Sequence, residues 1–379
     1  MQSRQQASDR ISGFPPEEKT LTQTARAIRA PGWGTVTLGG HQLSWRMLLF
    51  WAGVTFWLGN MILHTGLSGI RELRASLYFV AEIIVITSAT RTIGLDLVAK
   101  FYCWGGTVMG VMWLVSAVFT SFVPSPDAVS RQFFVPFMEE SLKLAPVAYL
   151  LWRGRTSRSW TMGASDIMLM AAASGGGFGL VEEAYFHLHN GPTRALDWLP
   201  LTRINGPTLT VGHSTWTGLA GATLGLALLW GPRKPLNYVL AGSGILWSIF
   251  DHSHHNYGVD RTGFSVDLFN FVTGHGWIAL YLFVLAVILV VTSDLYVVRG
   301  TLSGSPELKI PRLSGLEDLE RVWRFLMVRR GLAYLMFKSR YTSGRNRAEL
   351  ILQGNALDQS LARFHNQLSG PALQSQTDQ

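Results

Sequence analysis

Long apolar stretches alternate with short polar breaks along this chain, and the apolar stretches have the length of membrane-spanning helices. About 20 residues, rising 1.5 Å each, are needed to cross the hydrocarbon core of a bilayer. We identify eight such segments, at 47–63, 73–90, 101–123, 133–152, 162–186, 207–230, 236–256 and 269–291. The pattern predicts an all-α polytopic membrane protein with about eight transmembrane helices and a cytosolic helical C-terminal tail.

Composition supports this class and divides the chain into three regions. Hydrophobic residues make up 48% of the sequence and charged residues only 15%, which is typical of a protein embedded in lipid. We expect an N-terminal tail at 1–44, a transmembrane core at 45–292 and a basic, mostly helical tail at 293–379. The first tail has no apolar core of signal-peptide type, so we expect the first span to act as an uncleaved anchor.

The net charge of +8 is explained by membrane orientation better than by binding of nucleic acid. Six Lys and Arg residues occur up to Arg46 and twelve from Arg299 onward, whereas the predicted inner loops hold seven and the outer loops six. Basic residues collect on the cytosolic side of membrane proteins. Both tails are therefore predicted to be cytosolic, in an integral protein of the plasma (inner) membrane. The predicted helix at 316–341 either lies on anionic headgroups or packs on the inner loops.

Five patches of ionisable residues interrupt the apolar segments. A charge at such a depth costs roughly 2.5–3.5 kcal/mol on insertion scales, so these patches mark a candidate site. When the helices alternate in direction, all five patches fall near the outer boundary, and we expect them to converge in the outer leaflet. The patches contain Glu139, Glu140 and Lys143; Glu182 and Glu183; His213; Asp251, His252, His254 and His255; and His275.

Glu139, Glu140 and Lys143 form an E-E-x-x-K motif on one helix face, because the lysine is four residues after one glutamate and three after the other. The lysine can keep one carboxylate ionised while the second serves as an acid, a base or an activator of water. The alternative is a neutralised ion triplet that fixes the helix register.

Phe178 and Glu182 form F-x-x-x-E after a run of glycines at 175–177. A phosphate-binding loop requires a strand-to-helix turn and a lysine, so these glycines are better explained by close helix packing. His252 and Asn256 share one face of the seventh predicted helix. His254 and His255 fit a solvated interface, and Glu82 and Asp166 are each consistent with a satisfied contact between helices.

Several other intramembrane protease chemistries lack their signatures here. No H-E-x-x-H helix is present for a zincin, and no G-x-G-D run for a presenilin-like aspartyl site. A rhomboid-like pair of Ser174 and His252 would lack the glycine spacing of that family and would leave the buried glutamates unexplained. The single cysteine, Cys103, excludes an internal disulfide and a thiolate zinc cluster.

Four motifs on consecutive predicted helices together resemble the PrsW family of intramembrane proteases, relatives of the CAAX-processing and bacteriocin-processing membrane endopeptidases. They are E-E-x-x-K, F-x-x-x-E, a histidine early in the following helix at His213, and H-x-x-x-N at His252 and Asn256. The resemblance covers residues 101–291 and implies cleavage of a membrane-anchored protein, with anti-sigma factors as the substrate class. It carries over catalytic roles to Glu139, Glu140, Lys143, Glu182, His213, His252 and Asn256. The last position is often aspartate in the family, so Asn256 is a departure from the pattern.

Two mechanisms fit the same residues. Glu139 or Glu140 can deprotonate water while a histidine stabilises the oxyanion and Glu182 positions a histidine. Alternatively, His213, His252 and Glu182 can hold a zinc ion with water at the fourth position. A proton-coupled transporter is a rival class, although it predicts inverted repeats and polar groups at the midplane, and a non-catalytic scaffold is a third.

Overall fold

A computed structural model describes two compact units, residues 1–60 and 61–379, each considered by itself. The described residues are 35–38, 41–44, 73–74, 76–122, 128–153, 161–190, 195–196, 199–205, 208–231, 235–258, 264–302, 318–339, 348, 350–352, 354–355 and 359. In the first unit, β1 (Thr35–Leu38) and β2 (His41–Ser44) form an antiparallel hairpin. The all-α expectation is therefore incomplete for the N-terminal tail.

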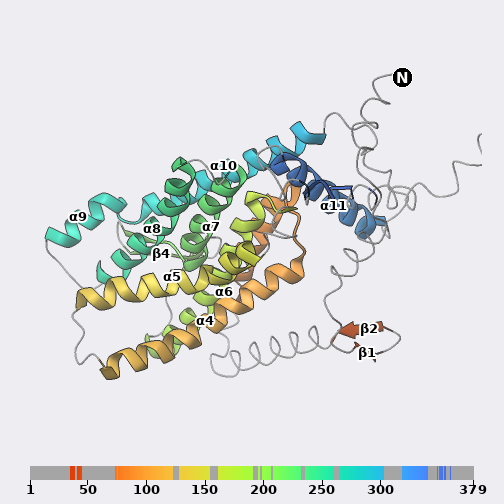
Figure 1. The fold of residues 1–379 in the computed structure, drawn as a ribbon. Helices are drawn as coiled ribbons and strands as arrows, with labels where there is room; N and C mark the ends of the chain where they lie inside the picture. The colour runs from red at the N-terminus through yellow and green to blue at the C-terminus, as the bar shows by residue number, and fades with distance from the viewer. Residues whose placement is uncertain are drawn as a thin grey trace, which may run out of the picture. The chain divides into compact units, whose positions relative to one another are not determined.

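Helices dominate the second unit, and α6 and α7 lie at its centre (Figure 1). α6 packs against α4 and α7, α7 also packs against α8 and α10, and α5 contacts α8. The helices are Ser76–Ala89, whose last turn is η1 (Thr87–Ala89), α4 (Leu95–Phe122), α5 (Ala128–Arg153), α6 (Ala164–Asn190), α7 (His213–Leu229), α8 (Pro235–Gly258), α9 (Phe264–Thr273), α10 (Trp277–Leu302) and α11 (Asp318–Ser339).

Helices occupy the places of the second to eighth predicted segments, whereas segment 47–63 lies outside the described residues. By length and hydropathy, two described stretches are able to span a membrane: Ala164–Glu183 and Asp267–Thr301. The first is 94% buried inside the protein, as expected for a central helix. The helical class is confirmed, while the number of eight spans stays a prediction.

The sixth predicted helix begins later than expected. Residues before His213 form a small antiparallel sheet of β3 (Ala195–Leu196), β4 (Leu199–Asn205) and β5 (Thr208–Thr210), with β4 in the middle. Gly212 is the N-cap, with extended φ and ψ of −80° and 168°, and α7 starts at His213. Two threonines favour the strand at β5, since β-branched residues suit extended backbone.

The eighth predicted helix is divided in two. Between α9 and α10, three consecutive residues have positive φ: Gly274 at 57°, His275 at 57° and Gly276 at 86°. The left-handed region ends a helix readily at glycine. The turn is also held by the sheet, because the amide of Leu209 donates to the His275 carbonyl at 2.8 Å.

Close approach between helices depends on the glycines of α6, as the sequence predicts. A Cβ added to Gly177 would overlap the carbonyl oxygen of Tyr102 on α4, and one added to Gly175 would overlap that of His213 on α7. Only glycine permits backbones to meet at these distances. The run at 175–177 therefore brings α4 and α7 against α6.

The N-terminal end of α6 is fixed by two buried aspartates. Asp294 of α10 accepts hydrogen bonds from the amides of Ala164 and Ser165 at 3.0 and 2.7 Å, as well as from the Ser165 hydroxyl. Asp166 accepts from the amides of Thr92, Ile93 and Gly163. Asp166 is thus a satisfied contact between elements, as interpreted from the sequence, and both carboxylates cap backbone N–H groups that would otherwise be unpaired.

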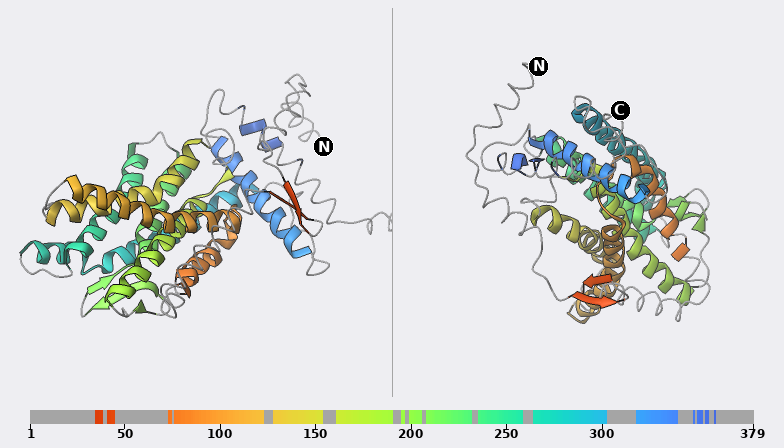
Figure 2. Two further views of the ribbon diagram at one scale, coloured as in Figure 1. Left: turned by 90° about the horizontal axis from the view of Figure 1, so that it is seen from below. Right: turned by 90° about the vertical axis from the view of Figure 1, so that its right-hand side faces the viewer.

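α11 lies beside α10 and packs on the same end of α6 (Figures 1 and 2). Arg330 donates to the carbonyls of Ser88 and Arg91, and Tyr334 donates to that of Thr90. Lys338 donates to the Met162 carbonyl at 2.7 Å. The predicted tail helix therefore forms, and this face of it packs on the protein's own loops.

Candidate active site

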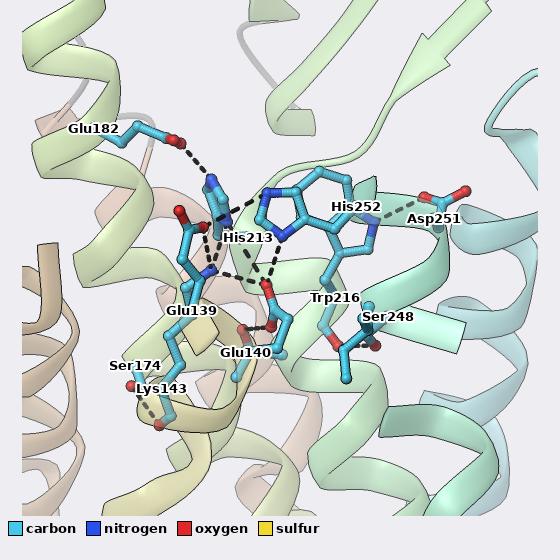
Figure 3. Close-up of polar contacts among 12 residues, drawn as sticks. Glu139, Glu140, Lys143, Ser174, Glu182, His213, Trp216, Ser248, Asp251 and His252 are labelled. Atoms are coloured by element: carbon cyan, nitrogen blue, oxygen red, sulfur yellow. Dashed lines mark hydrogen bonds and ion pairs between the residues drawn. The ribbon is translucent and has the colours of Figure 1, made fainter. Parts of the chain in front are cut away.

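Six of the seven predicted site residues come together from four consecutive helices (Figure 3). We call these residues the polar cluster: Glu139, Glu140 and Lys143 of α5, Glu182 of α6, His213 of α7 and His252 of α8. Their side chains meet although up to 113 positions separate them in the sequence. Helix packing therefore gathers four of the five polar patches.

Lys143 lies at the centre of the polar cluster, with a fully buried side chain. Its Nζ atom is 2.8 Å from Oε1 of Glu140, 3.7 Å from Oε2 of Glu139 and 2.7 Å from Nδ1 of His213. The ammonium group also lies 3.8 Å from the ring centroid of Phe178. The phenylalanine of F-x-x-x-E therefore provides an aromatic face for the buried charge.

Glu140 is fully buried and has partners on both oxygens. Thr217 donates to Oε2 at 2.8 Å, while Lys143 and Nδ1 of His252 lie 2.8 and 3.1 Å from Oε1. A carboxylate held by three groups is suited to orienting its neighbours rather than to moving during a reaction. Of the two adjacent glutamates, Glu140 is therefore the fixed one.

Glu139 and Glu182 are each less restrained than Glu140: Glu139 has an oxygen without a hydrogen-bond partner among the described residues, and Glu182 is partly exposed. Oε2 of Glu139 is buried and has no hydrogen-bond partner among the described residues; it lies 3.6 Å from Nε2 of His252. The Glu182 side chain is 18% exposed, and its Oε2 is bonded to Nε2 of His213. Water reaching the cluster therefore meets Glu182 first.

The hydrogen bonds assign the protons of both imidazoles. The Lys143 ammonium can only donate, so Nδ1 of His213 accepts and its Nε2 carries the proton shared with Glu182. In His252, Nδ1 faces the Glu140 carboxylate and donates to it. The lone pair on Nε2 of His252 is thereby directed toward Glu139.

Glu139, His213 and His252 are able to hold a metal ion, since their donor atoms lie within 4.8 Å of one another. With all three carboxylates ionised and both imidazoles neutral, the single ammonium leaves two negative charges in the cluster, which a divalent cation would balance. Oε2 of Glu139 has no hydrogen-bond partner among the described residues and is available as a ligand atom. One nitrogen of His213 must exchange its present partner for the ion.

The family model described as PrsW family intramembrane metalloprotease matches residues 94–292. The chain belongs to this family. It is thus an integral membrane protein of an intramembrane protease family, and the matched span contains the whole polar cluster. Searches of the curated proteins and of the solved structures gave no match.

The predicted ligand set and the geometric one differ in their carboxylate. The sequence suggested His213, His252 and Glu182, whereas the group that meets a metal's needs contains Glu139. Glu182 is instead bonded to His213. Only the packed structure shows that Glu182 is already bonded to His213, while Oε2 of Glu139 has no hydrogen-bond partner among the described residues.

Three other predicted residues lie away from the polar cluster or have other partners. Asn256 is exposed near the end of α8, and His275 is exposed in the turn before α10. The segment around His275 is a turn and not continuous helix, and the expectation that its patch lies at the same depth as the others stays a prediction. His254 was expected to be solvated, but it is 5% exposed and bonded to Asn270 at 3.0 Å.

Sequence reasoning missed the residues that surround the polar cluster. Thr217 hydrogen-bonds Glu140, Trp216 stacks on His252, and Ser174 donates to the Lys143 carbonyl at 2.9 Å. The first two follow His213 by one turn, so a helical projection from that histidine would have found them. Neither residue is ionisable, and for that reason the search for charges in apolar segments passed over both.

Proposed function

We propose that this PrsW-family chain hydrolyses a peptide bond in a membrane-anchored protein and that Glu139, His213 and His252 hold a catalytic divalent ion such as zinc. The observation that carries this is the 3.6 Å distance between Nε2 of His252 and Oε2 of Glu139, a buried oxygen with no hydrogen-bond partner among the described residues. One carboxylate and two imidazoles form a three-ligand set of the kind used by catalytic zinc sites.

The other cluster residues have roles that follow from their contacts. Glu140 orients His252, and Lys143 offsets the negative charge of the glutamates. A bound divalent ion supplies Lewis-acid polarisation of the scissile carbonyl and of a water molecule. Glu182, the most exposed carboxylate of the three, orients His213 and accepts the proton of the attacking water.

The substrate and the membrane orientation are part of the same proposal. A single-pass protein is the expected substrate, in the anti-sigma-factor-like class implied by the family resemblance. The excess of Lys and Arg in both tails supports a plasma-membrane protein with cytosolic tails and a site in the outer leaflet. Asn256 is exposed on the helix of His252, at the position where the family motif ends, and its proposed role is contact with substrate.

A metal-free mechanism is the second candidate, and one observation favours it. Both ring nitrogens of His213 already have partners, Lys143 and Glu182. In that case Oε2 of Glu139 accepts the proton of water directly, and His252 stabilises the oxyanion as an imidazolium, with Nδ1 donating to Glu140 and a protonated Nε2 donating to the oxyanion. The two candidates use the same residues and differ in what Glu139 binds.

The proposed hydrolase activity is tested by comparing cleavage of membrane proteins by the wild type and by a Glu139 variant. The full chain and its Glu139→Gln variant are expressed in the same bacterial host, and cleaved fragments of single-pass membrane proteins are compared by quantitative mass spectrometry. We expect fragments with the wild type that are absent with Glu139→Gln. The matched control, Glu82→Gln, changes a half-buried glutamate outside the polar cluster and keeps the fragments. Identical fragments for the wild type and Glu139→Gln would contradict the hydrolase and favour the non-catalytic scaffold.

Metal analysis of the same proteins separates the two mechanisms. Wild-type protein purified in detergent is expected to bind one zinc ion, and Glu139→Gln to bind it much more weakly, since a ligand is lost. Wild-type protein that produces fragments but binds no zinc would establish the metal-free mechanism, whereas equal zinc binding in the two proteins would show that Glu139 is not a ligand.

A further inference from the structure

Trp216 is the one aromatic residue that contacts both imidazoles of the polar cluster within the described chain. Its indole stacks on the His252 ring, with 4.3 Å between centroids and 14° between planes. It meets the His213 ring edge to face, at 5.1 Å and 77°. Trp216 is 2% exposed, so the indole is buried beside the two imidazoles.

The indole is anchored to the helix that carries His252 (Figure 3). Its Nε1 donates to Oδ2 of Asp251 at 2.7 Å, and the Trp216 carbonyl accepts from the hydroxyl of Ser248 at 2.6 Å. Both partners belong to α8. The indole therefore cannot rotate away from His252 without breaking a contact between α7 and α8.

The buried position of Asp251 is energetically unfavourable. It is 3% exposed, and its Oδ1 atom has no hydrogen-bond partner in the part of the chain that the structure describes. Burial of a carboxylate with one unpaired oxygen is unfavourable. The negative charge of Asp251 polarises the indole through the N–H bond and raises the electron density of the ring face that contacts His252. This favours a positively polarised imidazole.

The stacking and the Glu140 contact restrict His252 in complementary ways. The bond from Nδ1 to Glu140 fixes one edge of the ring, and the indole face fixes the plane of the ring. Nε2 then has a single direction, toward Glu139. Without the indole, the ring could pivot about the Glu140 contact and lose that direction.

We propose that Trp216 and Asp251 are positioning residues, which act together to hold the His252 ring so that Nε2 is directed at the ligand position and to favour its metal-bound form. This inference rests on the proposed function, because it assigns His252 as a ligand. It adds an outer support of the kind that tunes metal sites.

Zinc affinity of the full chain in detergent, measured by competition with a chromophoric chelator, is the first test. Trp216→Leu is expected to weaken zinc binding by about 10–100-fold, the usual effect of losing a supporting residue. Trp216→Phe and Asp251→Asn, which are conservative in volume, are expected to give smaller losses. Trp247→Phe is the matched control, because Trp247 is on α8 and packs on Phe250 away from His252. Affinities equal to the control in all three variants would overturn the proposal.

A second measurement needs no metal. Metal-free protein is treated with diethyl pyrocarbonate, and modification of His252 is measured relative to the exposed His275 by mass spectrometry. Trp216→Leu is expected to raise this ratio several-fold, and Trp247→Phe to leave it unchanged. An unchanged ratio in Trp216→Leu would overturn the proposal.

The two measurements keep this inference distinct from the proposed function. If wild-type protein binds no zinc, the metal assignment fails and the modification ratio alone decides whether Trp216 holds the ring. If Trp216→Leu does not fold, as judged by circular dichroism, Trp216→Phe and Asp251→Asn decide through both measurements, with wild-type values contradicting the proposal.

Discussion

Nδ1 of His252 lies 3.1 Å from Oε1 of Glu140, the same oxygen that accepts from the Lys143 ammonium at 2.8 Å. Thr217 occupies the other oxygen. A histidine that donates to a carboxylate through one nitrogen has the other nitrogen fixed in direction, an arrangement characteristic of histidine ligands. In the proposed mechanism, Glu140 therefore acts through His252.

Glu140→Gln is predicted to impair both stability and zinc binding. An amide cannot balance the charge of Lys143, and breaking a buried ion pair costs about 3–5 kcal/mol. The loss of orientation at His252 is expected to weaken zinc binding by about 10–100-fold. Thermal unfolding in detergent and chelator competition measure the two effects.

The double variant Glu140→Gln/Lys143→Gln separates them. Removal of the ammonium that has lost its closer carboxylate is expected to recover part of the stability without recovering zinc affinity. Recovery of both would show that Glu140 serves only to pair Lys143.

Gly175→Ala is predicted to disturb the site without changing any polar side chain. The new Cβ would overlap the carbonyl oxygen of His213 and lie 2.9 Å from Cα of Ser214. Because backbone cannot yield as a flexible side chain does, the first turn of α7 must shift together with the His213 ring. We expect weaker zinc binding and a lower unfolding temperature.

Gly110→Ala provides the control for that substitution. Gly110 is also within a helix, α4, and a Cβ there meets nothing within 4 Å. It is expected to stabilise by about 0.5–1 kcal/mol, the helix-propensity difference between alanine and glycine. Equal zinc affinities in Gly175→Ala and Gly110→Ala would contradict the close-packing argument.

Much of the polar cluster could be predicted because charge in an apolar segment is visible in a sequence. Glu139, Lys143, Glu182, His213 and His252 each interrupt such a segment, and their spacing matches known motifs. The sequence does not show which glutamate keeps an oxygen without a hydrogen-bond partner. It depends on Thr217 and His252 reaching Glu140, and those contacts form only when α5, α7 and α8 pack together.

Helix ends were less predictable than helices. The two wrong boundaries, at His213 and at the turn 274–276, meet each other in space through the bond from Leu209 to His275. This backbone hydrogen bond joins residues that are 66 positions apart, and hydropathy averaged over a window does not detect it. The predicted eighth segment also ended before Asp294, so the carboxylate that caps α6 was not considered.

Asp294→Ala is predicted to destabilise the protein while leaving the polar cluster intact. The substitution leaves the amides of Ala164 and Ser165 and the Ser165 hydroxyl without their acceptor. Loss of a helix cap typically costs about 0.5–2 kcal/mol, and unpaired buried donors add to this. Calorimetry in detergent should show a lower unfolding temperature than for Asp96→Ala, whose side chain is 71% exposed.

Zinc binding by the folded fraction of Asp294→Ala distinguishes a loss of stability from damage to the polar cluster. Asp294 is at the N-terminal end of α6, and Glu182 follows 18 residues after Ala164, about 27 Å along the helix axis. The affinity is therefore expected to equal that of wild type. A loss of affinity comparable to that of Glu140→Gln would indicate that the capped end and the polar cluster are coupled.

Lys338 of α11 predicts a specific pH dependence of stability. Burial lowers the pKa of Lys338 to about 8, although Asp294 and Asp166 act in the opposite direction. In the unfolded chain the pKa is near its ordinary value of 10.5. Between these two values the unfolded state binds more protons, so the free energy of unfolding rises with pH over this window.

Lys338→Met removes the titrating group and is expected to abolish that rise, because methionine fills a similar volume without a charge. The measured quantity is the difference in unfolding free energy between wild type and variant, in detergent, from pH 7 to pH 10. It should be constant up to about pH 8 and then move in favour of wild type, since deprotonation relieves the cost of burying the ammonium. A difference that stays flat, or that moves in favour of the variant, would mean that Lys338 keeps its proton in the folded protein and that its bond to Met162 is sufficient to stabilise the charge.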